Sequence, residues 1–412
     1  MIKLGVFGAR RGECMIRWCN QFKKAQVVAI CDFDETIVNH LKDKFKDMNI
    51  KFYKHFDEFI KHDLDAVILA NYATEHAPFA IKCLDAKIHV LSEVLPCQTM
   101  KEAVELVEAV DRNNVIYAYA ENYCYMPATR EMRRLYQKGE LGEFEYGEGE
   151  YVHNCEPLWP MITYGDKNHW RNNMYSTYYC THSIGPLIHI TGLKPIKVVG
   201  FELPFNEKSA RMGSKAGSAG IEIITLENGA VIKSLHGVAL EKNSIWYSIY
   251  GTKGRIESAR EDAQNGAMGR IYTNLNKKEG KYIDNPQTYL PEDDERQKLN
   301  MDHGSSDYII MNNFVNAIKG KKSDIIGVYE ALDMFLPGMF AYYSILNNNS
   351  SMIIPNLRLK EERDKYRNDT RCVNKEKAGD MLIPSYSKGD TEIPNEIYQK
   401  IKKDYLKTME EK

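Results

Sequence analysis

The chain has 412 residues, a length that suits two domains better than a single core. Its 55 basic and 57 acidic residues leave a net charge of -2, which gives no electrostatic reason to expect nucleic acid or an anionic membrane as a partner. The sequence has no run of eighteen apolar residues, no signal-peptide pattern and nine scattered cysteines without a C-x-x-C pair, so we expect a soluble cytoplasmic protein with reduced thiols.

The chain opens with a strand, a tight turn and a helix. Residues 2 to 8 are apolar enough for a buried parallel strand, and Gly8 and Gly12 bracket the turn. The helix carries one apolar stripe suited to packing on a sheet, formed by Met15, Trp18, Cys19 and Phe22. This pattern is typical of the first unit of a dinucleotide-binding domain.

An acidic residue ends the second strand. Residues 27 to 31 read as that strand, and Asp32 follows the glycine turn at the distance where a carboxylate binds an adenosine ribose, so NAD is expected rather than NADP. The glycine pattern is degenerate, because Arg10 occupies the position of the second glycine and Glu13 that of the third. Arg10 and Arg11 are either surface charges or groups that neutralise cofactor phosphates.

Alternating strands and helices continue along the first third of the chain. Further strands are predicted at 65 to 70, 88 to 93 and 115 to 120, which indicates an α/β Rossmann domain with a doubly wound parallel sheet over residues 1 to 124. Glu93 ends one of these strands, at the sheet edge where such domains bind ligands. The alternative is a domain of the same architecture that holds another ligand, or none.

The character of the sequence changes near residue 125. Residues 126 to 142 read as a helix closed by Gly139 or Gly142, and alternating segments then predict a large, mostly antiparallel, open sheet. Its strands are expected at 143 to 153, 196 to 205, 220 to 227, 230 to 238 and 244 to 250. Asn228-Gly229, between the third and fourth of these, predicts a two-residue hairpin.

The rest of the chain completes a second domain and a tail. Helices are expected at 306 to 319 and 329 to 346, so residues 125 to 356 are predicted to form an α+β domain. Residues 357 to 412 are dense in charge, and we interpret them as a solvated tail that wraps either this domain or a neighbouring subunit. No chemistry is assigned to the tail.

Several of these segments carry a resemblance. The GARRG turn, the stretch NYATEHAPFAIKCLDAKIHVLSE and the later TYYCTHSIGPLIHITGLKP resemble the glucose-fructose oxidoreductase/inositol dehydrogenase (Gfo/Idh/MocA) family. The resemblance implies NAD in the Rossmann domain, a small sugar or glycoside against the open sheet, and a homo-oligomer that pairs these sheets across subunits. The cofactor-binding residues it implies are Gly8, Arg10, Arg11, Gly12, Asp32, Asn71, His76, Glu93 and Glu121.

The chain departs from the ordinary dehydrogenases of that family at two positions. They carry Glu-Lys-Pro after the fifth strand and an Asp-x-x-x-His pair in the second domain. Here Val94 takes the lysine position, and Tyr178 lies four residues before His182, so only the histidine is kept. A lysine beside an alcohol eases loss of its proton while hydride leaves, and valine does not. We therefore expect another acid-base set.

A closer resemblance supplies one. AENYCY at 120 to 125, GEGEYVH at 147 to 153 and Tyr-x-Thr-His at 179 to 182 are similar to NAD-dependent glycosidases of the family, typified by alpha-N-acetylgalactosaminidases. The match implies that Tyr179 and His182 form an acid-base pair. It also implies catalytic Tyr151 and Arg171 facing the sugar, with Glu121 on the nicotinamide side.

The resemblance implies hydride transfer at a ring carbon, most plausibly C3, that drives elimination and cleavage of the glycosidic bond with no net oxidation. A net sugar or glycoside 3-dehydrogenase and a non-catalytic NAD-sensing regulator remain alternatives. So do structural interpretations in which His182 is a core histidine, Tyr151 a packed aromatic residue, Glu121 a cap and His76 a surface side chain. The other histidines lack ligand spacing, so no metal is expected: His153, His169 and His189.

Overall fold

The computed structural model describes residues 1–266, 268–278, 280–292 and 306–410, and the chain divides into two compact units. The first comprises Met1–Met126, Glu292–Leu332 and Leu357–Asp369; the second comprises Pro127–Pro291, Asp333–Asn356 and Thr370–Lys412. This division differs from the predicted 1–124, 125–356 and 357–412. Part of the difference comes from tertiary contacts, because Tyr308 packs its ring against Phe22, 4.7 Å between centroids, and so joins the first unit.

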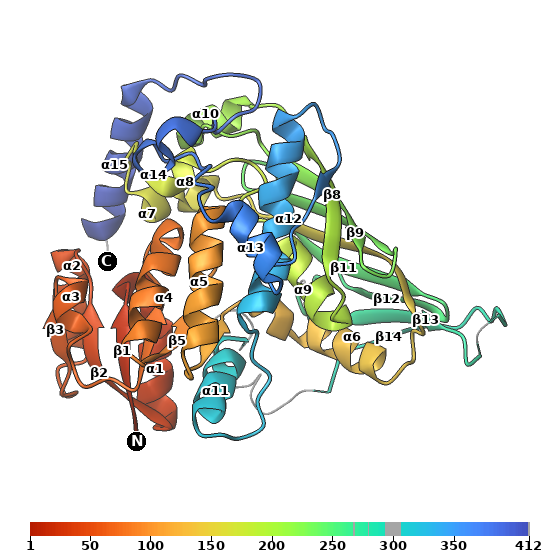
Figure 1. Cartoon of the computed structure of the whole chain (residues 1–412), viewed down its shortest axis with the longest axis horizontal. Coiled ribbons are helices and arrows are strands. Elements are labelled where there is room, and N and C mark those ends of the chain that lie inside the picture. The colour runs from red at the N-terminus through yellow and green to blue at the C-terminus, as the bar shows by residue number, and fades with distance from the viewer. Residues whose placement is uncertain (267, 279, 293–305, 411–412) are drawn as a thin grey trace. The chain divides into compact units, whose positions relative to one another are not determined.

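The first unit is built on a six-stranded parallel sheet, as predicted for a Rossmann domain, with strand order β3-β2-β1-β4-β5-β6. The strands are β1 Ile2–Phe7, β2 Ala25–Cys31, β3 Lys51–Tyr53, β4 Ala66–Leu69, β5 His89–Ser92 and β6 Tyr117–Tyr119. The helices are α1 Ala9–Phe22, α2 Glu35–Lys44, α3 Phe56–Phe59, α4 His76–Asp85, α5 Met100–Arg112, α11 Ser306–Ile318 and α13 Lys360–Tyr366. Two short 3-10 helices are η1 Ala73–Glu75 and η2 Asn122–Tyr125. Figure 1 shows α4 and α5 beside this sheet.

The glycine turn follows β1 directly. Gly8 has a φ of 90°, and a side chain there would collide with the main chain of Ala70 and Asn71. A side chain at Gly12 would collide with Val6, so this glycine lets α1 pack closely on β1. Close helix-strand packing is the role of the third glycine in the usual pattern; here Glu13 occupies that position and Gly12, one residue earlier, provides the packing.

The second unit holds a nine-stranded sheet of order β14-β13-β12-β11-β7-β10-β9-β8-β15. Its strands are β7 Phe144–Val152, β8 Pro195–Glu202, β9 Gly220–Leu226, β10 Val231–Gly237, β11 Ser244–Gly251, β12 Gly254–Ser258, β13 Ile271–Leu275, β14 Pro286–Tyr289 and β15 Met352–Ile353. All pairs between these described strands are antiparallel except β7 with β10, so the mostly antiparallel sheet is confirmed. The Asn228-Gly229 hairpin joins β9 to β10 as predicted.

Helices cover one face of this sheet. A side chain at Gly149 of β7 would collide with the main chain of Ser183, and one at Gly200 of β8 with that of Ala341. The glycines therefore let α9 and α12 pack closely on the sheet. The helices are α6 Pro127–Gln137, α7 Trp159–Thr163, α8 Trp170–Asn173, α9 Thr181–Thr191, α10 Glu207–Met212, α12 Val328–Leu346, α14 Lys375–Ala378 and α15 Asn395–Glu410, with the 3-10 helices η3 Glu156–Leu158 and η5 Gly379–Met381. The division between the two units falls within α12.

The charged C-terminal segment is folded rather than solvated along its length. It contains α13, α14 and α15, and Tyr398 and Ile401 of α15 are buried. These two buried positions were not recognised in the sequence, because charged residues surround them and a helix needs few apolar positions to pack on one face. The segment packs on the same chain, as Figure 1 shows along α15, and a contact with a neighbouring subunit stays a prediction.

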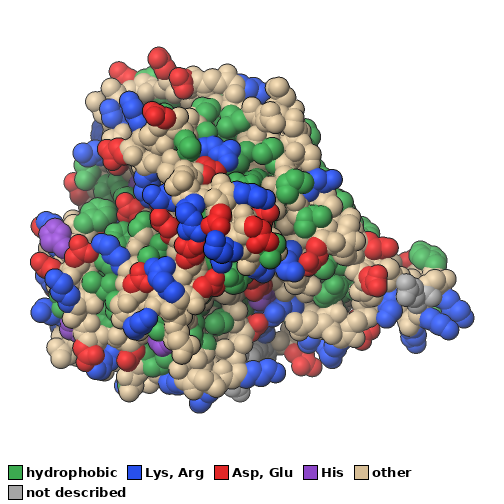
Figure 2. Space-filling model, viewed as in Figure 1, with side chains coloured by type: hydrophobic (Ala, Val, Ile, Leu, Met, Phe, Trp, Pro, Cys, Tyr) green, Lys and Arg blue, Asp and Glu red, His purple; other side chains and the backbone are tan. Residues whose placement is uncertain are grey.

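The surface is mixed in charge. Figure 2 shows Lys and Arg side chains interspersed with Asp and Glu over the face in view, in keeping with the net charge of -2. All nine cysteines are buried and none forms a disulfide. Within the described residues, no helix has both the length and the apolar character needed to cross a bilayer.

Candidate active site

The carboxyl edge of the first sheet gathers most of the predicted cofactor residues. Asp32, just after β2, is buried, and its carboxylate accepts hydrogen bonds from the main-chain N–H of Ala9 at 2.7 Å and of Asp34 at 2.9 Å. Burial raises the pKa of Asp32, while these two hydrogen bonds and the charge of Arg10 oppose the rise. Asp32 thus ties the end of β2 to the first turn of α1.

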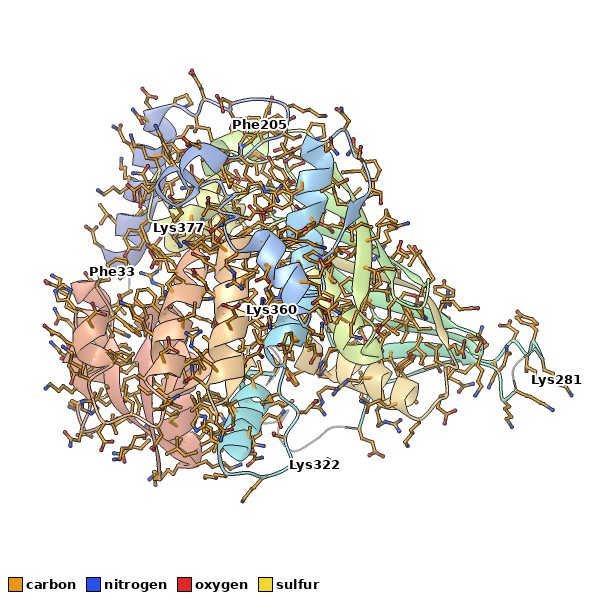
Figure 3. The ribbon with its side chains drawn as sticks, in the orientation of Figure 1. Phe33, Phe205, Lys281, Lys322, Lys360 and Lys377 are labelled. Carbon is orange, nitrogen blue, oxygen red and sulfur yellow. The ribbon has the colours of Figure 1, made fainter. Side chains whose placement is uncertain are left out.

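A cavity and an aromatic pair lie beside Asp32. The cavity measures about 320 Å³ and is lined by Asp32, Glu35, Val38, Asn39, Lys42, Phe52, Tyr53 and Lys54. Phe33, labelled in Figure 3, is 62% exposed and meets Tyr72 edge to face with centroids 5.9 Å apart. Sequence analysis missed this pair, because two rings far apart in the chain give no local signal. The exposed ring of Phe33, beside the half-buried Tyr72, suits a flat heterocycle.

Asn71 and His76 lie where β4 ends. His76 is buried, not the surface histidine that was one alternative, and its ring nitrogens lie 2.8 Å from the Leu95 carbonyl oxygen and 3.2 Å from that of Asn71. Burial lowers the pKa of His76 to about 4. His76 therefore braces the loops after β4 and β5. The side-chain oxygen of Asn71 is buried and finds no hydrogen-bond partner within the described part of the chain.

Arg11 is held inside the first unit by two carboxylates. Its guanidinium lies 2.7 Å from Glu93 and donates hydrogen bonds of 3.0 and 2.9 Å to Asp307 of α11. The side chain of Asp307 is 1% exposed and that of Glu93 11%. Neither predicted alternative for Arg11, surface charge or phosphate ligand, anticipated this ion cluster. Sequence reasoning missed Asp307 because 296 residues separate it from Arg11.

Glu121 is another predicted cofactor residue of this unit. It is fully buried, and its carboxylate accepts a hydrogen bond of 3.2 Å from the main-chain N–H of Tyr123, so it caps η2. The capping interpretation thus holds, and a role toward nicotinamide stays a prediction. Val94, which replaces the family lysine, is 6% exposed.

These features fit a dinucleotide. Gly8 brings the main chain of β1 close to that of Asn71, the N-terminus of α1 starts at Ala9, and Asp32 faces a cavity. The buried side-chain oxygen of Asn71 offers an acceptor that a ligand hydroxyl or amide can satisfy. Within the described residues, no group of three or more His, Cys, Asp or Glu is placed to hold a metal ion.

The second unit brings three of the predicted catalytic and sugar-binding residues to one place. His182 lies in the first turn of α9, which begins at Thr181. The His182 ring meets that of Tyr151 with centroids 4.6 Å apart and that of Tyr179 at 5.0 Å. Tyr151 comes from β7 and Tyr179 from the turn before α9, so the sheet and this turn each contribute a phenol.

Arg171 joins this cluster from α8. Its guanidinium carbon lies 4.5 Å from the ring centroid of Trp170 and 4.7 Å from that of Tyr179. One guanidinium nitrogen donates a hydrogen bond of 3.4 Å to the Tyr179 hydroxyl. The positive charge therefore lies beside a phenol oxygen, where it favours negative charge developing on that oxygen.

Two more histidines belong to the cluster, although sequence reasoning treated one as scattered and passed over the other. The ring of His236, on β10, stacks parallel to that of Tyr151 at 5.8 Å, and the ring of His153 lies 6.0 Å from it. His236 Nδ1 lies 3.0 Å from the Ser176 carbonyl oxygen, and burial lowers the pKa of His236 to about 4. His236 lies opposite Tyr151 because β10 pairs in parallel with β7, so knowledge of this pairing would have placed His236 in the cluster.

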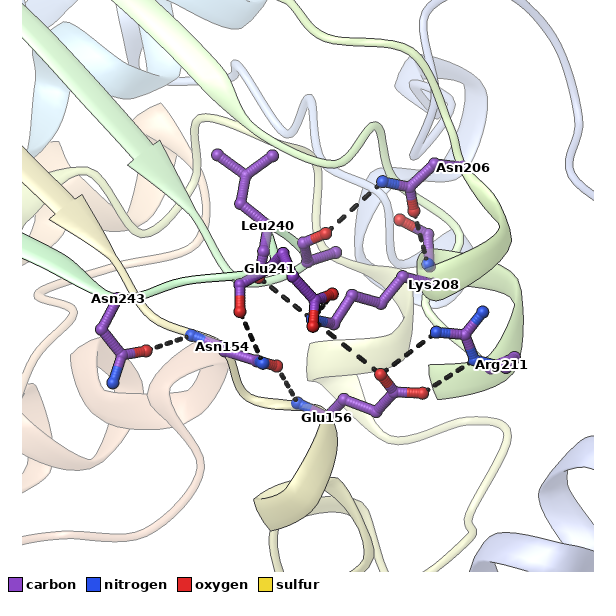
Figure 4. A network of polar contacts seen from close by, with 10 residues as sticks. Asn154, Glu156, Asn206, Lys208, Arg211, Leu240, Glu241 and Asn243 are labelled. Atoms are coloured by element: carbon purple, nitrogen blue, oxygen red, sulfur yellow. Dashed lines mark hydrogen bonds and ion pairs between the residues drawn. The ribbon is translucent and has the colours of Figure 1, made fainter.

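A polar network fixes the chain directly after His153 (Figure 4). Arg211 donates a hydrogen bond of 2.9 Å to Glu156, and buried Lys208 donates one of 3.1 Å to Glu241. Asn154 donates a hydrogen bond of 2.9 Å to the main-chain oxygen of Glu241. These contacts tie the end of β7 to α10 and to the loop after β10, and so hold one rim of the cluster in place.

Tyr178, in the position of the family aspartate, does not join the cluster. Its ring meets Phe335 edge to face at 5.6 Å and Tyr175 at 5.1 Å, within the core under α12. The hydroxyl of Tyr247 on β11 donates a hydrogen bond to the main-chain oxygen of His182 and so anchors α9 to the sheet. The cluster therefore contains imidazole, phenol and guanidinium groups.

Two family models match the chain. Residues 2–121 match the model described as "Oxidoreductase family, NAD-binding Rossmann fold", and residues 196–361 match "Glycosyl hydrolase 109, C-terminal domain". The first span contains all the predicted cofactor residues, and the second contains β9 to β15 of the large sheet and all of β8 except Pro195.

Several known proteins are similar to this chain over most of their length. A glycosyl hydrolase family 109 protein from Shewanella putrefaciens is 20% identical over 390 residues, which cover 86% of this chain and 84% of that protein. The structure of myo-inositol 2-dehydrogenase from Lactobacillus plantarum has a TM-score of 0.66 at 17% identity, covering 86% of this chain and 99% of that one. Levoglucosan dehydrogenase in complex with NADH and levoglucosan has a TM-score of 0.70 at 16% identity, covering 86% and 99%.

Proposed function

Because the chain belongs to the Gfo/Idh/MocA oxidoreductases and is an NAD-dependent enzyme of that type, we propose that it cleaves a glycoside by oxidising the sugar ring transiently. The observation that carries the proposal is the cluster of Tyr151, Tyr179, His182 and Arg171 in the second unit. The substrate proposed is a pyranoside, and the carbon oxidised is C3. The relatives named glycosyl hydrolase family 109 support cleavage rather than net oxidation.

NAD, when bound, supplies the chemistry of accepting a hydride from the sugar and returning it at the end of the cycle. The first unit would hold it through the turn at Gly8 and Gly12, the carboxylate of Asp32 and the amide of Asn71. Arg11 and His76 would act on it by keeping Glu93 and the loops after β4 and β5 in place. The sugar would lie on the Tyr-His-Arg cluster of the second unit.

The residues of the cluster then move protons. His182 takes the proton of the C3 hydroxyl, because an imidazole can accept and return a proton near neutral pH. The ketone at C3 makes the C2 proton acidic. Tyr179, whose oxygen lies beside the positive charge of Arg171, acts as its phenolate: it takes the C2 proton and becomes a neutral phenol. Loss of that proton expels the C1 substituent, and Tyr151 donates a proton to the departing oxygen.

The second half of the cycle reverses these steps. Water adds at C1 of the enone, C2 regains a proton, and reduction of the ketone restores the C3 hydroxyl with a proton from His182. The sum is hydrolysis, with one water consumed and no net redox change. Absence of a lysine at Val94 fits this scheme, since His182 and the two phenols supply the acid-base groups.

The test is to identify the bound nucleotide by mass spectrometry and to incubate the enzyme with a panel of nitrophenyl pyranosides in deuterated water. The expected result is aglycone release without build-up of NADH, and deuterium at C2 of the free sugar. A stoichiometric rise in NADH with the glycoside intact would identify a net 3-dehydrogenase instead. No turnover of any pyranoside would overturn the proposal.

A matched pair of variants ties the activity to the cluster. His182→Asn is expected to reduce kcat at least a hundredfold, the range for loss of general acid-base catalysis. His40→Asn makes the same change on the exposed face of α2 and should leave kcat unchanged. Equal activity of the two variants would contradict the role of His182.

A further inference from the structure

We propose that the C-terminal helix α15 positions Arg171 in the sugar site, acting through Tyr405 and the loop of residues 164–169. This inference rests on the proposed function and assigns a role to a segment beyond residues 196–361, the part matched as the C-terminal domain of glycosyl hydrolase family 109. Both the helix and the loop belong to the second unit. Arg171 acts on the sugar; Tyr405 is a positioning residue.

A continuous series of ring contacts leads from α15 to Trp170. Tyr405 meets Tyr164 edge to face with centroids 5.2 Å apart, and Tyr164 meets His169 at 5.9 Å. His169 stacks on Trp170 at 5.9 Å, and Trp170 lies under the guanidinium of Arg171. The planar guanidinium is thus stacked on a ring that is itself supported, through two more rings, by α15.

The main chain of the loop also rests on α15. Tyr164 and Gly165 both have positive φ, 57° and 70°, a conformation that costs energy at a tyrosine and persists only where packing holds it. A side chain at Gly165 would lie 2.5 Å from the main-chain nitrogen of Lys402 and the oxygen of Tyr398. Backbone therefore meets backbone here, and α15 is the element that holds the turn.

The other end of α8 is tied to the same C-terminal segment. The Ser385 hydroxyl donates a hydrogen bond of 2.6 Å to the main-chain oxygen of Asn173. Lys215 donates its main-chain N–H to Asn172 at 2.9 Å, and the Thr391 hydroxyl donates one of 2.9 Å to the Lys215 oxygen. The short helix that carries Arg171 is therefore fixed at both ends by residues 385–405.

His169 links the loop to Arg171 directly. Its Nδ1 accepts a hydrogen bond of 3.2 Å from the main-chain N–H of Arg171, and burial followed by the nearby positive charge of Arg171 lowers the pKa of His169 to about 3. A neutral His169 keeps Nδ1 free to accept this bond. A four-residue helix has too few internal hydrogen bonds to hold Arg171 alone, so its placement depends on these tertiary contacts.

A cavity of about 620 Å³ lies between the loop and α15, lined by Tyr164, Gly165, Asp166, Lys167, Asn168, Asn395, Tyr398, Gln399, Lys402, Tyr405 and Leu406. Because this space separates much of the loop from α15, the ring of Tyr405 and the contact at Gly165 carry the support. Loss of the ring gives the loop room to move. Arg171 then loses its stacked position, and sugar binding weakens.

The experiment uses three variants of the full chain: Tyr405→Leu, Tyr405→Phe and Lys403→Ala. Lys403 is exposed on the same helix and outside the cavity lining, which makes it the control. Tyr405→Leu is expected to raise KM for the glycoside, and to weaken sugar affinity measured by calorimetry, roughly tenfold with kcat little changed. Tyr405→Phe keeps the ring and should behave as the native chain does.

A double-mutant cycle with Arg171→Met separates the possible outcomes. If α15 acts through Arg171, Tyr405→Leu has no further effect on sugar affinity once Arg171 is replaced. Additive effects, or a Tyr405→Leu variant with native affinity, would overturn the role of α15 while leaving the proposed function intact. If Arg171→Met itself keeps native affinity and activity, the proposed sugar site is wrong.

A milder variant guards against loss of folding. Thr391→Val removes the hydrogen bond to Lys215 without changing side-chain volume, and it is expected to raise KM in the same direction by roughly twofold to threefold. Native thermal unfolding with a raised KM supports the positioning role. If Thr391→Val and Tyr405→Leu, each made singly, both keep the native KM, the positioning role of α15 is contradicted.

Discussion

Arg11 and Asp307 form a two-pronged ion pair across 296 residues of sequence, with hydrogen bonds of 3.0 and 2.9 Å. Glu93 lies 2.7 Å from the same guanidinium. The pair joins the first helix of the Rossmann domain to α11, a helix that follows β14 of the second unit in the chain. Its position explains why residues 306–332 fold with the N-terminal domain.

We predict that Arg11→Met destabilises the protein by about 3 to 5 kcal/mol, because it leaves two buried carboxylates without their counter-charge. Urea unfolding monitored in the presence and absence of NAD measures this. Arg11→Lys should recover only part of the loss, because an ammonium does not reproduce the two-pronged geometry. A variant with native stability but weakened NAD affinity would show instead that Arg11 binds phosphate.

Gly12→Ala is predicted to destabilise the first unit by about 1 to 3 kcal/mol, since the added carbon would collide with Val6 of β1 and push α1 off the sheet. Gly327→Ala is the matched control, because a side chain there meets nothing within 4 Å. Thermal unfolding of both variants is the measurement. Equal unfolding temperatures would mean that α1 does not need this close approach.

His236→Asn is predicted to flatten the acid side of the stability profile. Burial lowers the pKa of native His236 to about 4, so the unfolded chain, with an ordinary histidine pKa near 6.5, binds more protons between these values. The contribution of neutral His236 to the free energy of unfolding is therefore fully present above pH 6.5, and it is lost as the pH drops toward 4. The asparagine amide can still donate a hydrogen bond to the Ser176 carbonyl oxygen. As the pH falls over this range, the free energy of unfolding should drop by up to about 3 kcal/mol less in the variant than in the native chain.

The check is urea unfolding at pH 7 and at pH 4.5 for the native chain, His236→Asn and the exposed control His40→Asn. Burial also lowers the pKa values of His76 and His169, to about 4 and about 3, so these two histidines still make stability fall at acid pH. The fall between pH 7 and pH 4.5 should therefore be smaller in His236→Asn than in the native chain, but not zero. An identical slope in native chain and His236→Asn would contradict the prediction.

Glu222→Gln is predicted to act in the opposite direction on the pH scale. Glu222 is fully buried in β9; burial raises its pKa to about 8, and the nearby cross-strand Ser234 offsets this rise only in part. The folded chain then binds more protons than the unfolded chain between about pH 4.5 and 8, so stability falls as the pH rises through this range. The glutamine variant avoids that fall.

At pH 5 we expect Glu222→Gln to match the native chain, and at pH 8.5 to exceed it by on the order of 4 kcal/mol. Glu145→Gln, on an exposed position of β7, should show no such gain. Denaturation midpoints at the two pH values provide the comparison. A gain at pH 5 as large as at pH 8.5 would mean that packing, and not protonation, is responsible.

Much of the fold could be read from local pattern. The structure confirms the features that depend on neighbours within a few residues. These are the buried strands such as β4 and β5, the apolar stripe of α1 and the Asn228-Gly229 hairpin. Five short strands, β3 and β12 to β15, escaped prediction, because their pairing partners supply the burial that sequence alternation did not display.

The sequence by itself determined the chemistry available: an acid after β2, no lysine at Val94, and the phenols and imidazole of Tyr151, Tyr179 and His182. Only the tertiary structure decided which groups meet. Parallel pairing of β7 with β10 added His236, and packing of α15 on a distant loop set the place of Arg171. The physical reason is that residue type fixes what a side chain can do, while contacts between segments far apart in the chain fix where it does it.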